Sequence, residues 1–141
     1  MPTDTRRQRG DRAEAAAADL LSGLGHRLLA RNLRLGRLEV DVLSIDPADG
    51  SLVLTEVKAR RAGRHAPELR VDHRKRHHLE TAARMLLVRP DLRRLAVRFD
   101  VIAVELDHHG APCSLRHLPR AFDAASRQPP AGPRKYRSSA N

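Results

Sequence analysis

The 141-residue chain lacks tryptophan and contains only one cysteine, one tyrosine and two phenylalanines. A single cysteine excludes an internal disulfide framework and fits a reducing compartment. With so few aromatic residues, any core must be built from Leu, Val, Ile and Ala. No apolar run approaches the roughly 20 residues of a membrane span. The alanine-rich stretch near the N-terminus contains Glu14 and Asp19, which a secretory signal would not carry. We therefore expect a cytoplasmic protein with no membrane association.

Acidic residues are also in the minority. The chain has 17 Asp and Glu against 27 Lys and Arg, which gives a formal net charge of +10. Such a balance favours polyanionic partners, with nucleic acid first and an anionic membrane surface second. The alternative is a soluble basic protein that has no specific polyanion.

The length suits one domain with a sizeable core. Residues 1–9 are polar and basic, and we expect them to form an N-terminal arm. Residues 10–123 carry the periodic apolar segments and are predicted to form a single domain. Beyond them, proline, serine and charge predict a disordered basic tail over residues 124–141.

Apolar periodicity separates the predicted helices from the predicted strands. The expected elements are, in chain order, a helix (11–24), three strands (27–31, 38–45 and 51–59), a helix (71–88) and a strand (95–106). The second and third strands form a hairpin around the turn DPADG. Residues 107–123 remain open between a loop, an edge strand around 114–116 and a short helical turn. This α-β-β-β-α-β order predicts an α/β fold with a mixed central sheet flanked by helices.

The predicted hairpin carries ionisable residues on an otherwise apolar face. Side chains alternate along a strand, so Glu56 and Lys58 share a face with leucines on the return strand. If Ile45 pairs with Leu52 across the turn, antiparallel geometry places Asp41 opposite Glu56. The two acids would then have Cβ atoms about 5 Å apart.

Two carboxylates at that separation repel each other in a partly buried site, and a divalent cation removes the penalty because it prefers several oxygen ligands. The same register places Glu39 opposite Lys58, where the lysine can steady an attacking water or a phosphate oxygen. The alternative is structural. Glu39 and Lys58 would be a plain cross-strand ion pair, and Asp41 and Glu56 would point to solvent.

Short motifs at ordered spacings carry a family resemblance. They are Gly10 with Glu14, GLGHRLLARN (23–32), LEVD (38–41), TEVKAR (55–60), Lys75 and RFDV (98–101). Over roughly residues 9–106 the chain resembles the YraN family of small bacterial proteins, and more widely the PD-(D/E)xK nuclease superfamily. Leu38 stands where the family pattern has a glycine.

The resemblance implies a restriction-endonuclease-like core, which archaeal Holliday-junction resolvases share. By position it implies Asp41 and Glu56 as metal ligands, the Val57 carbonyl as a further ligand, Lys58 as the catalytic lysine and Glu14 as a helix-borne acid reaching the same site. The implied activity is Mg²⁺- or Mn²⁺-dependent endonucleolytic hydrolysis of phosphodiester bonds in DNA. Junction-cutting proteins of this fold act as dimers, which leaves a homodimer open.

Basic residues in the loop at 60–68 and at the start of the second predicted helix are expected to bind nucleic acid. They are Arg60, Arg61, Arg64, Arg74, Lys75 and Arg76. The second group opens a predicted helix, whose N-terminus also favours anions. The alternative is a solvated basic face.

Asp100 lies in the predicted internal strand, and we expect a structural role with an arginine or a backbone donor as its partner. Two other functions remain open beside the nuclease. One is a non-catalytic nucleic-acid-binding module on the same fold, and the other is a scaffold or assembly protein whose basic tail docks on a partner.

Overall fold

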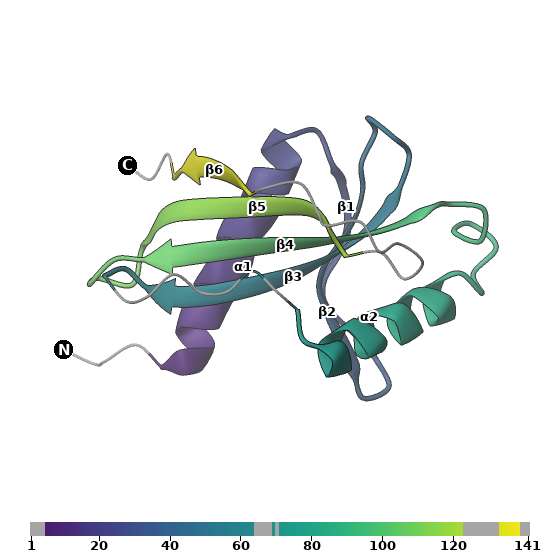
Figure 1. Ribbon diagram of the computed structural model, residues 1–141, viewed down its shortest axis with the longest axis horizontal. Helices are drawn as coiled ribbons and strands as arrows, with labels where there is room; N and C mark the ends of the chain where they lie inside the picture. The colour runs from purple at the N-terminus through teal and green to yellow at the C-terminus, as the bar shows by residue number, and fades with distance from the viewer. Residues whose placement is uncertain (1–4, 64–68, 70, 123–132, 139–141) are drawn as a thin grey trace.

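The structure is a computed structural model that describes residues 5–63, 69, 71–122 and 133–138. Its elements are, in chain order, α1 (Arg6–Gly23), β1 (Arg27–Leu35), β2 (Leu38–Ile45), β3 (Leu52–Arg61), α2 (His73–Leu86), β4 (Val97–Leu106), β5 (Pro112–Phe122) and β6 (Arg134–Arg137). The strands form one six-stranded sheet in the order of the sequence. Only β3 and β4 are parallel, and α2 connects them (Figure 1). The predicted α/β class with a mixed sheet is confirmed.

The two helices cover opposite faces of the sheet (Figure 1). Ala17 and Leu21 of α1 pack with Ile102 and Val104 of β4. The residues of α2 belong to a second cluster, which takes the alternate side chains of the same strands. Alternation along the strands thus builds two cores, one on each side of the sheet.

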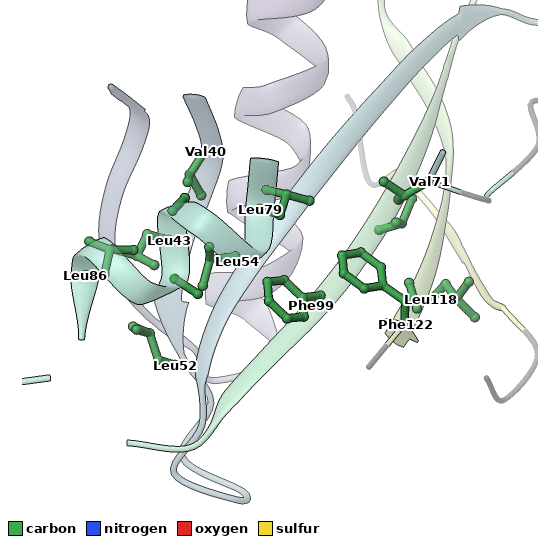
Figure 2. Packing of buried hydrophobic residues seen from close by; sticks show 14 of the residues in the cluster. Val40, Leu43, Leu52, Leu54, Val71, Leu79, Leu86, Phe99, Leu118 and Phe122 are labelled. Carbon is green, nitrogen blue, oxygen red and sulfur yellow. The ribbon is translucent and has the colours of Figure 1, made fainter. Parts of the chain in front are cut away.

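The core beneath α2 is aliphatic apart from one aromatic pair (Figure 2). Phe99 of β4 and Phe122 of β5 stack with their ring centroids 4.6 Å apart. Leu79 and Leu86 of α2 pack in the same cluster, on the side of the helix that its periodicity predicts. The expectation of a core built mainly from aliphatic side chains is confirmed.

Helix α1 begins at Arg6, earlier than the predicted start at residue 11. Thr5 is its N-cap. The Thr5 hydroxyl accepts a hydrogen bond from the Gln8 amide, and the Gln8 side chain accepts one from the Thr5 amide. This capping box satisfies amides that a frayed end would leave to water. Residues 6–9, expected in an N-terminal arm, are therefore the start of the helix.

The hairpin forms in the predicted register at its turn, where Ile45 pairs with Leu52. The ladder ends at Val42 and Thr55, however, so it does not extend to Asp41 and Glu56. Beyond this point β2 and β3 diverge.

The ladder between β2 and β3 ends before Glu39, which is paired with Arg34 of β1, so the predicted pairing of Glu39 with Lys58 is wrong. The reason is that β2 stays with β1 while it leaves β3. Leu38 opens β2 in register with Leu35, and its φ is not positive. The turn before it uses Gly36, at a φ of 62°, for the left-handed conformation.

The C-terminal part of the chain is more ordered than its composition predicts. Strand β5 spans the whole of 112–122 and is not an edge strand, because β6 pairs with it from Ser114 to His117. Arg134–Arg137 thus form a strand within the segment expected to be a disordered tail. Residues 123–132 and 139–141 lie outside the described residues.

Asp100 is fully buried on β4 and has the partners expected of a structural acid. The Arg98 guanidinium donates to both of its oxygens, at 2.9 and 3.0 Å. The backbone amide of Arg120 donates at 3.1 Å, and His117 Nε2 lies 2.8 Å away. Although burial opposes ionisation, these bonds lower the pKa of Asp100.

Arg98 extends this network to the hairpin turn, where it contacts Asp46 at 2.7 Å and Asp49 at 3.0 Å. The turn between β2 and β3 is therefore tied to β4 by a buried guanidinium. The polar residues at this end of the sheet form a network of ion pairs and hydrogen bonds that stabilises the fold.

We expect Asp100→Asn to lower the free energy of unfolding by about 3 kcal/mol, because it leaves Arg98 buried without its bidentate partner. Denaturant unfolding measures the loss. Asp91→Asn is the matched control. It removes an exposed ion pair with Arg89 and is expected to cost less than about 1 kcal/mol. Equal losses of unfolding free energy in the two variants would contradict a structural role for Asp100.

Candidate functional site

The candidate site lies where β2 and β3 separate, beyond the Val42–Thr55 pair. This point of separation is the fork. The backbone amide of Val57 does not continue the ladder but donates a hydrogen bond of 2.8 Å to Oδ2 of Asp41. Asp41 is half-buried and is held at the fork by this bond. Burial raises its pKa, and the Val57 amide and the Lys75 ammonium partly offset that rise.

Three carboxylates from two elements meet on one side of the fork. Glu14 comes from α1, and Glu39 and Asp41 come from β2; one carboxylate oxygen from each lies within 4.8 Å of the other two. Residues 39 and 41 are two positions apart and share a face of β2. Glu14 approaches that face from the helix. Glu14, Glu39 and Asp41 form the acid cluster.

Glu14 is held in an environment that disfavours its charge. Burial and the neighbouring Asp41 carboxylate raise the pKa of Glu14 to about 7, although a hydrogen bond with Asn32 opposes the rise. Its Oε2 atom is buried and has no hydrogen-bond partner among the described residues. Asn32 itself has a φ of 51°, a left-handed conformation that asparagine tolerates better than most residues.

Glu56 lies on the other side of Asp41, toward α2. Its carboxylate forms an ion pair with the Lys75 ammonium, with 3.3 Å between Oε2 of Glu56 and Nζ of Lys75. Burial and the charge of Asp41 raise the pKa of Glu56 to about 7, against the opposing effect of Lys75 and Lys58. Asp41 is therefore the residue that links the acid cluster to the Glu56–Lys75 pair.

The structure brings the predicted acids together but distributes them differently from the expected ligand set. Asp41 is central to both groups. Glu56 is outside the acid cluster, because it is paired with Lys75 on the α2 side. Val57 contributes its amide to Asp41, and a role for its carbonyl stays a prediction.

Glu39 is the member of the acid cluster that was not predicted from the sequence. The sequence predicts Glu39 opposite Lys58, with a plain cross-strand ion pair as the structural alternative. The available signal was its position two residues before Asp41, on the same face of the same strand. Because β2 remains paired with β1 at Glu39, a residue two positions before Asp41 lies beside it in the acid cluster.

The lysines of the site come from two elements. Lys58 is half-buried on β3, two residues after Glu56, and its charge lowers the pKa of Glu56. Lys75 forms an ion pair with Glu56, and nucleic-acid binding by Lys75 stays a prediction. It stands in the first turn of α2, whose N-cap is Asp72.

The arginines expected to bind nucleic acid fall into different environments. Arg60 pairs with Glu105 of β4, and Arg76 donates to the Val71 carbonyl while it stacks over the Phe122 ring. Both side chains thus have structural contacts.

Arg61 and Arg74 are exposed. Arg64 lies outside the described residues. Nucleic-acid binding by the exposed arginines stays a prediction.

The donors of the acid cluster suit a hard divalent cation. Three carboxylates offer oxygen ligands, which Mg²⁺ and Mn²⁺ prefer. The buried Glu14 oxygen has no partner, although buried polar atoms usually have one. Burial raises the pKa values of Glu14 and Asp41, so their charged forms lack stabilisation that a cation would supply. The residues present therefore fit a divalent ion.

Sequence comparison is consistent with this architecture. The profile of the uncharacterised protein family UPF0102, which is the YraN family, matches residues 13–104. The chain belongs to this family. The matched segment contains all the residues of the fork, from Glu14 to Lys75. No helix among the described residues is long and apolar enough to cross a membrane.

Three UPF0102 proteins illustrate the similarity. A protein of Nitratidesulfovibrio vulgaris (strain DP4) is 41% identical over 121 residues, which cover 85% of this chain and 87% of that relative. One of Trichlorobacter lovleyi is 39% identical over 117 residues, covering 82% and 91%. One of Moorella thermoacetica is 37% identical over 121 residues, covering 85% and 99%. The UPF0102 relatives thus match nearly the whole folded region.

The raised pKa values of Glu14 and Glu56 predict how stability depends on pH. Each carboxyl binds its proton more tightly in the folded chain, so its stabilising contribution is full below about pH 4.5 and is lost as the pH rises to about 7. In buffer with EDTA we expect Glu14→Gln and Glu56→Gln to be neutral at about pH 5. At about pH 8 each should stabilise the fold by about 1 kcal/mol, a modest effect because both groups are partly solvated.

Denaturant unfolding across this pH range measures the effect. Asp19→Asn, on the exposed part of α1, controls for the removal of a charge from the helix. If the two glutamine variants instead lower stability at about pH 8, the folded chain favours the carboxylate anions, and the electrostatic description of the fork is wrong.

Proposed function

We propose that this YraN-family protein is a divalent-metal-dependent endonuclease that hydrolyses phosphodiester bonds in DNA. The observation that carries the proposal is the acid cluster, in which Glu14, Glu39 and Asp41 converge beside a fourth acid, Glu56, and two lysines. A basic chain that gathers acids at one point has an electrostatic reason to bind a cation there.

The acid cluster would hold Mg²⁺ or Mn²⁺. When bound, such an ion polarises the phosphate and lowers the pKa of water. The protein's own contribution is positional. The Val57 amide holds one oxygen of Asp41, and α1 brings Glu14 to the face of β2 that carries Glu39.

Glu56 and the lysines have separate roles in the proposed reaction. With a pKa of about 7, Glu56 exchanges a proton at neutral pH, as a group that accepts a proton from water must. Lys75 orients its carboxylate. Lys58 supplies positive charge beside Glu56, where it would stabilise the negative charge that develops on the phosphate.

The net charge of +10 supports a polyanionic substrate. It also favours a second function, a nucleic-acid-binding module without turnover. The two functions share the binding surface and differ only in whether the fork performs chemistry. A homodimer stays a prediction for either one.

A cleavage assay separates them. The full chain is incubated with branched, nicked, single-stranded and duplex DNA in Mg²⁺, Mn²⁺ or EDTA. We expect metal-dependent cleavage by wild type, none by Asp41→Asn, and a rate at saturating DNA that falls about 100-fold or more in Lys58→Ala, because an electrostatic contact to the transition state is lost.

Lys135→Ala is the matched control for Lys58→Ala. Lys135 is an exposed lysine on β6, away from the fork, and its loss should leave the rate at saturating DNA within about twofold of wild type. If folded wild type cleaves none of the substrates in either metal, the nuclease proposal is wrong. If it binds them nonetheless, the non-catalytic module is the function.

A further inference from the structure

A basic pocket lies on the α1 side of β3, separate from the carboxylates of the fork. It has a volume of about 630 Å³ and is formed by the first turns of α1 and the C-terminal end of β3. Four arginines line it: Arg6, Arg9, Arg60 and Arg61. Among the described residues that line it there is no acid. Residues more than fifty positions apart in the sequence thus place guanidinium groups around one concave surface.

The arginines of α1 stand where a helix normally favours the opposite charge. Arg6 and Arg7 begin the helix, and its first turn contains no acidic residue. The positive end of the helix dipole makes cations unfavourable there and anions favourable. Together with Arg61 from β3, this arrangement concentrates positive potential in the pocket. It does not stabilise the helix, because cations are unfavourable at a helix N-terminus. Arg60 contributes less, because it is paired with Glu105.

Small and apolar residues share the pocket lining with the arginines. They include Val57, Ala59 and Leu106. Guanidinium groups bind phosphate oxygens in bidentate geometry. A sugar-phosphate backbone bound in the pocket can therefore place its phosphates against the arginines, and no acid of the lining is desolvated.

Val57 connects the pocket to the fork. Its side chain lines the pocket, and its amide donates to Asp41. This part of β3 lies beyond the last residue that pairs with β2, so the pocket and the acid cluster adjoin the same open edge of the strand. A chain bound in the pocket would continue past that edge toward Asp41.

We propose that the pocket between the start of α1 and the end of β3 binds backbone phosphates of a DNA strand that extends into the fork. The inference rests on the proposed function for its choice of DNA. It assigns Arg6 and Arg61 as phosphate-binding residues, and it places the main contact to the strand between the start of α1 and the end of β3.

Binding is measured by fluorescence anisotropy of labelled single-stranded and duplex DNA, with the full-length chain in EDTA, over a series of salt concentrations. The test variant is the double substitution Arg6→Ala with Arg61→Ala. We expect its affinity to fall about tenfold or more, and the slope of log affinity against log salt to become shallower by about 2 for duplex DNA, because two phosphate contacts are lost.

The matched control is Arg7→Ala with Arg94→Ala, which removes two exposed arginines that do not line the pocket. It should change affinity by less than about threefold. Circular dichroism and thermal unfolding of both double variants show that they fold. If the control loses as much affinity as the test variant, the charge acts without a specific site and the inference is overturned; unchanged binding by the test variant also overturns it.

Two further comparisons fix the ligand and separate the inference from the nuclease proposal. Vesicles of phosphatidylcholine and phosphatidylserine in equal parts test an anionic membrane surface. If the test variant loses vesicle binding and keeps DNA binding, the pocket serves a membrane and the inference is wrong. Because binding is read in EDTA, the loss of DNA affinity in the test variant supports the inference even if the wild type proves to have no nuclease activity.

Discussion

The hydrogen bond from the Val57 amide to the Asp41 carboxylate is the contact on which the candidate site depends. It takes the place of the next backbone bond in the ladder between β2 and β3, so the two strands separate at that point. The separation opens a fork in the sheet that both helices can reach. Glu14 enters from α1 and Lys75 from α2, and each interacts electrostatically with Asp41. Without the fork, the acids of β2 and β3 would be ordinary cross-strand neighbours.

The protein contains two groups of acids with opposite electrostatics. At the turn end, Asp100 has a guanidinium, an imidazole and a backbone amide as partners, and its pKa is lowered. At the fork, Glu14 and Glu56 have pKa values raised to about 7. The first group stabilises the fold through its own contacts. In the second group, burial and neighbouring acids disfavour the charged form of the carboxyls, as often happens at functional sites.

Most of the fold could be predicted from the sequence, because its signals are local. Alternation in LEVDVLSI and the turn DPADG predicted the hairpin, and the apolar spacing around Leu79 predicted α2. The start of α1 was missed because a capping box was hidden among arginines. Strand β6 was missed because RKYR is polar and becomes a strand only by pairing with β5.

The site could be predicted in part. Asp41, Glu56 and Glu14 were correctly expected in one region, since strand alternation and the family resemblance both pointed there. The grouping of the acids depends on where β2 leaves β3, which is a property of tertiary structure. That divergence moves Glu39 into the acid cluster and gives Glu56 to Lys75. The basic pocket likewise joins two segments whose proximity no local pattern reveals.

The most direct test of the proposed metal centre is anomalous diffraction from crystals of the full chain soaked in Mn²⁺. The acid cluster predicts a single strong manganese peak bounded by carboxylate oxygens of Glu14, Glu39 and Asp41, and no such peak in Asp41→Asn crystals. A peak coordinated by Glu56 and the Val57 carbonyl without Glu14 and Glu39 would contradict the acid cluster as the metal-binding group. The absence of any manganese peak at the fork would contradict the metal centre itself.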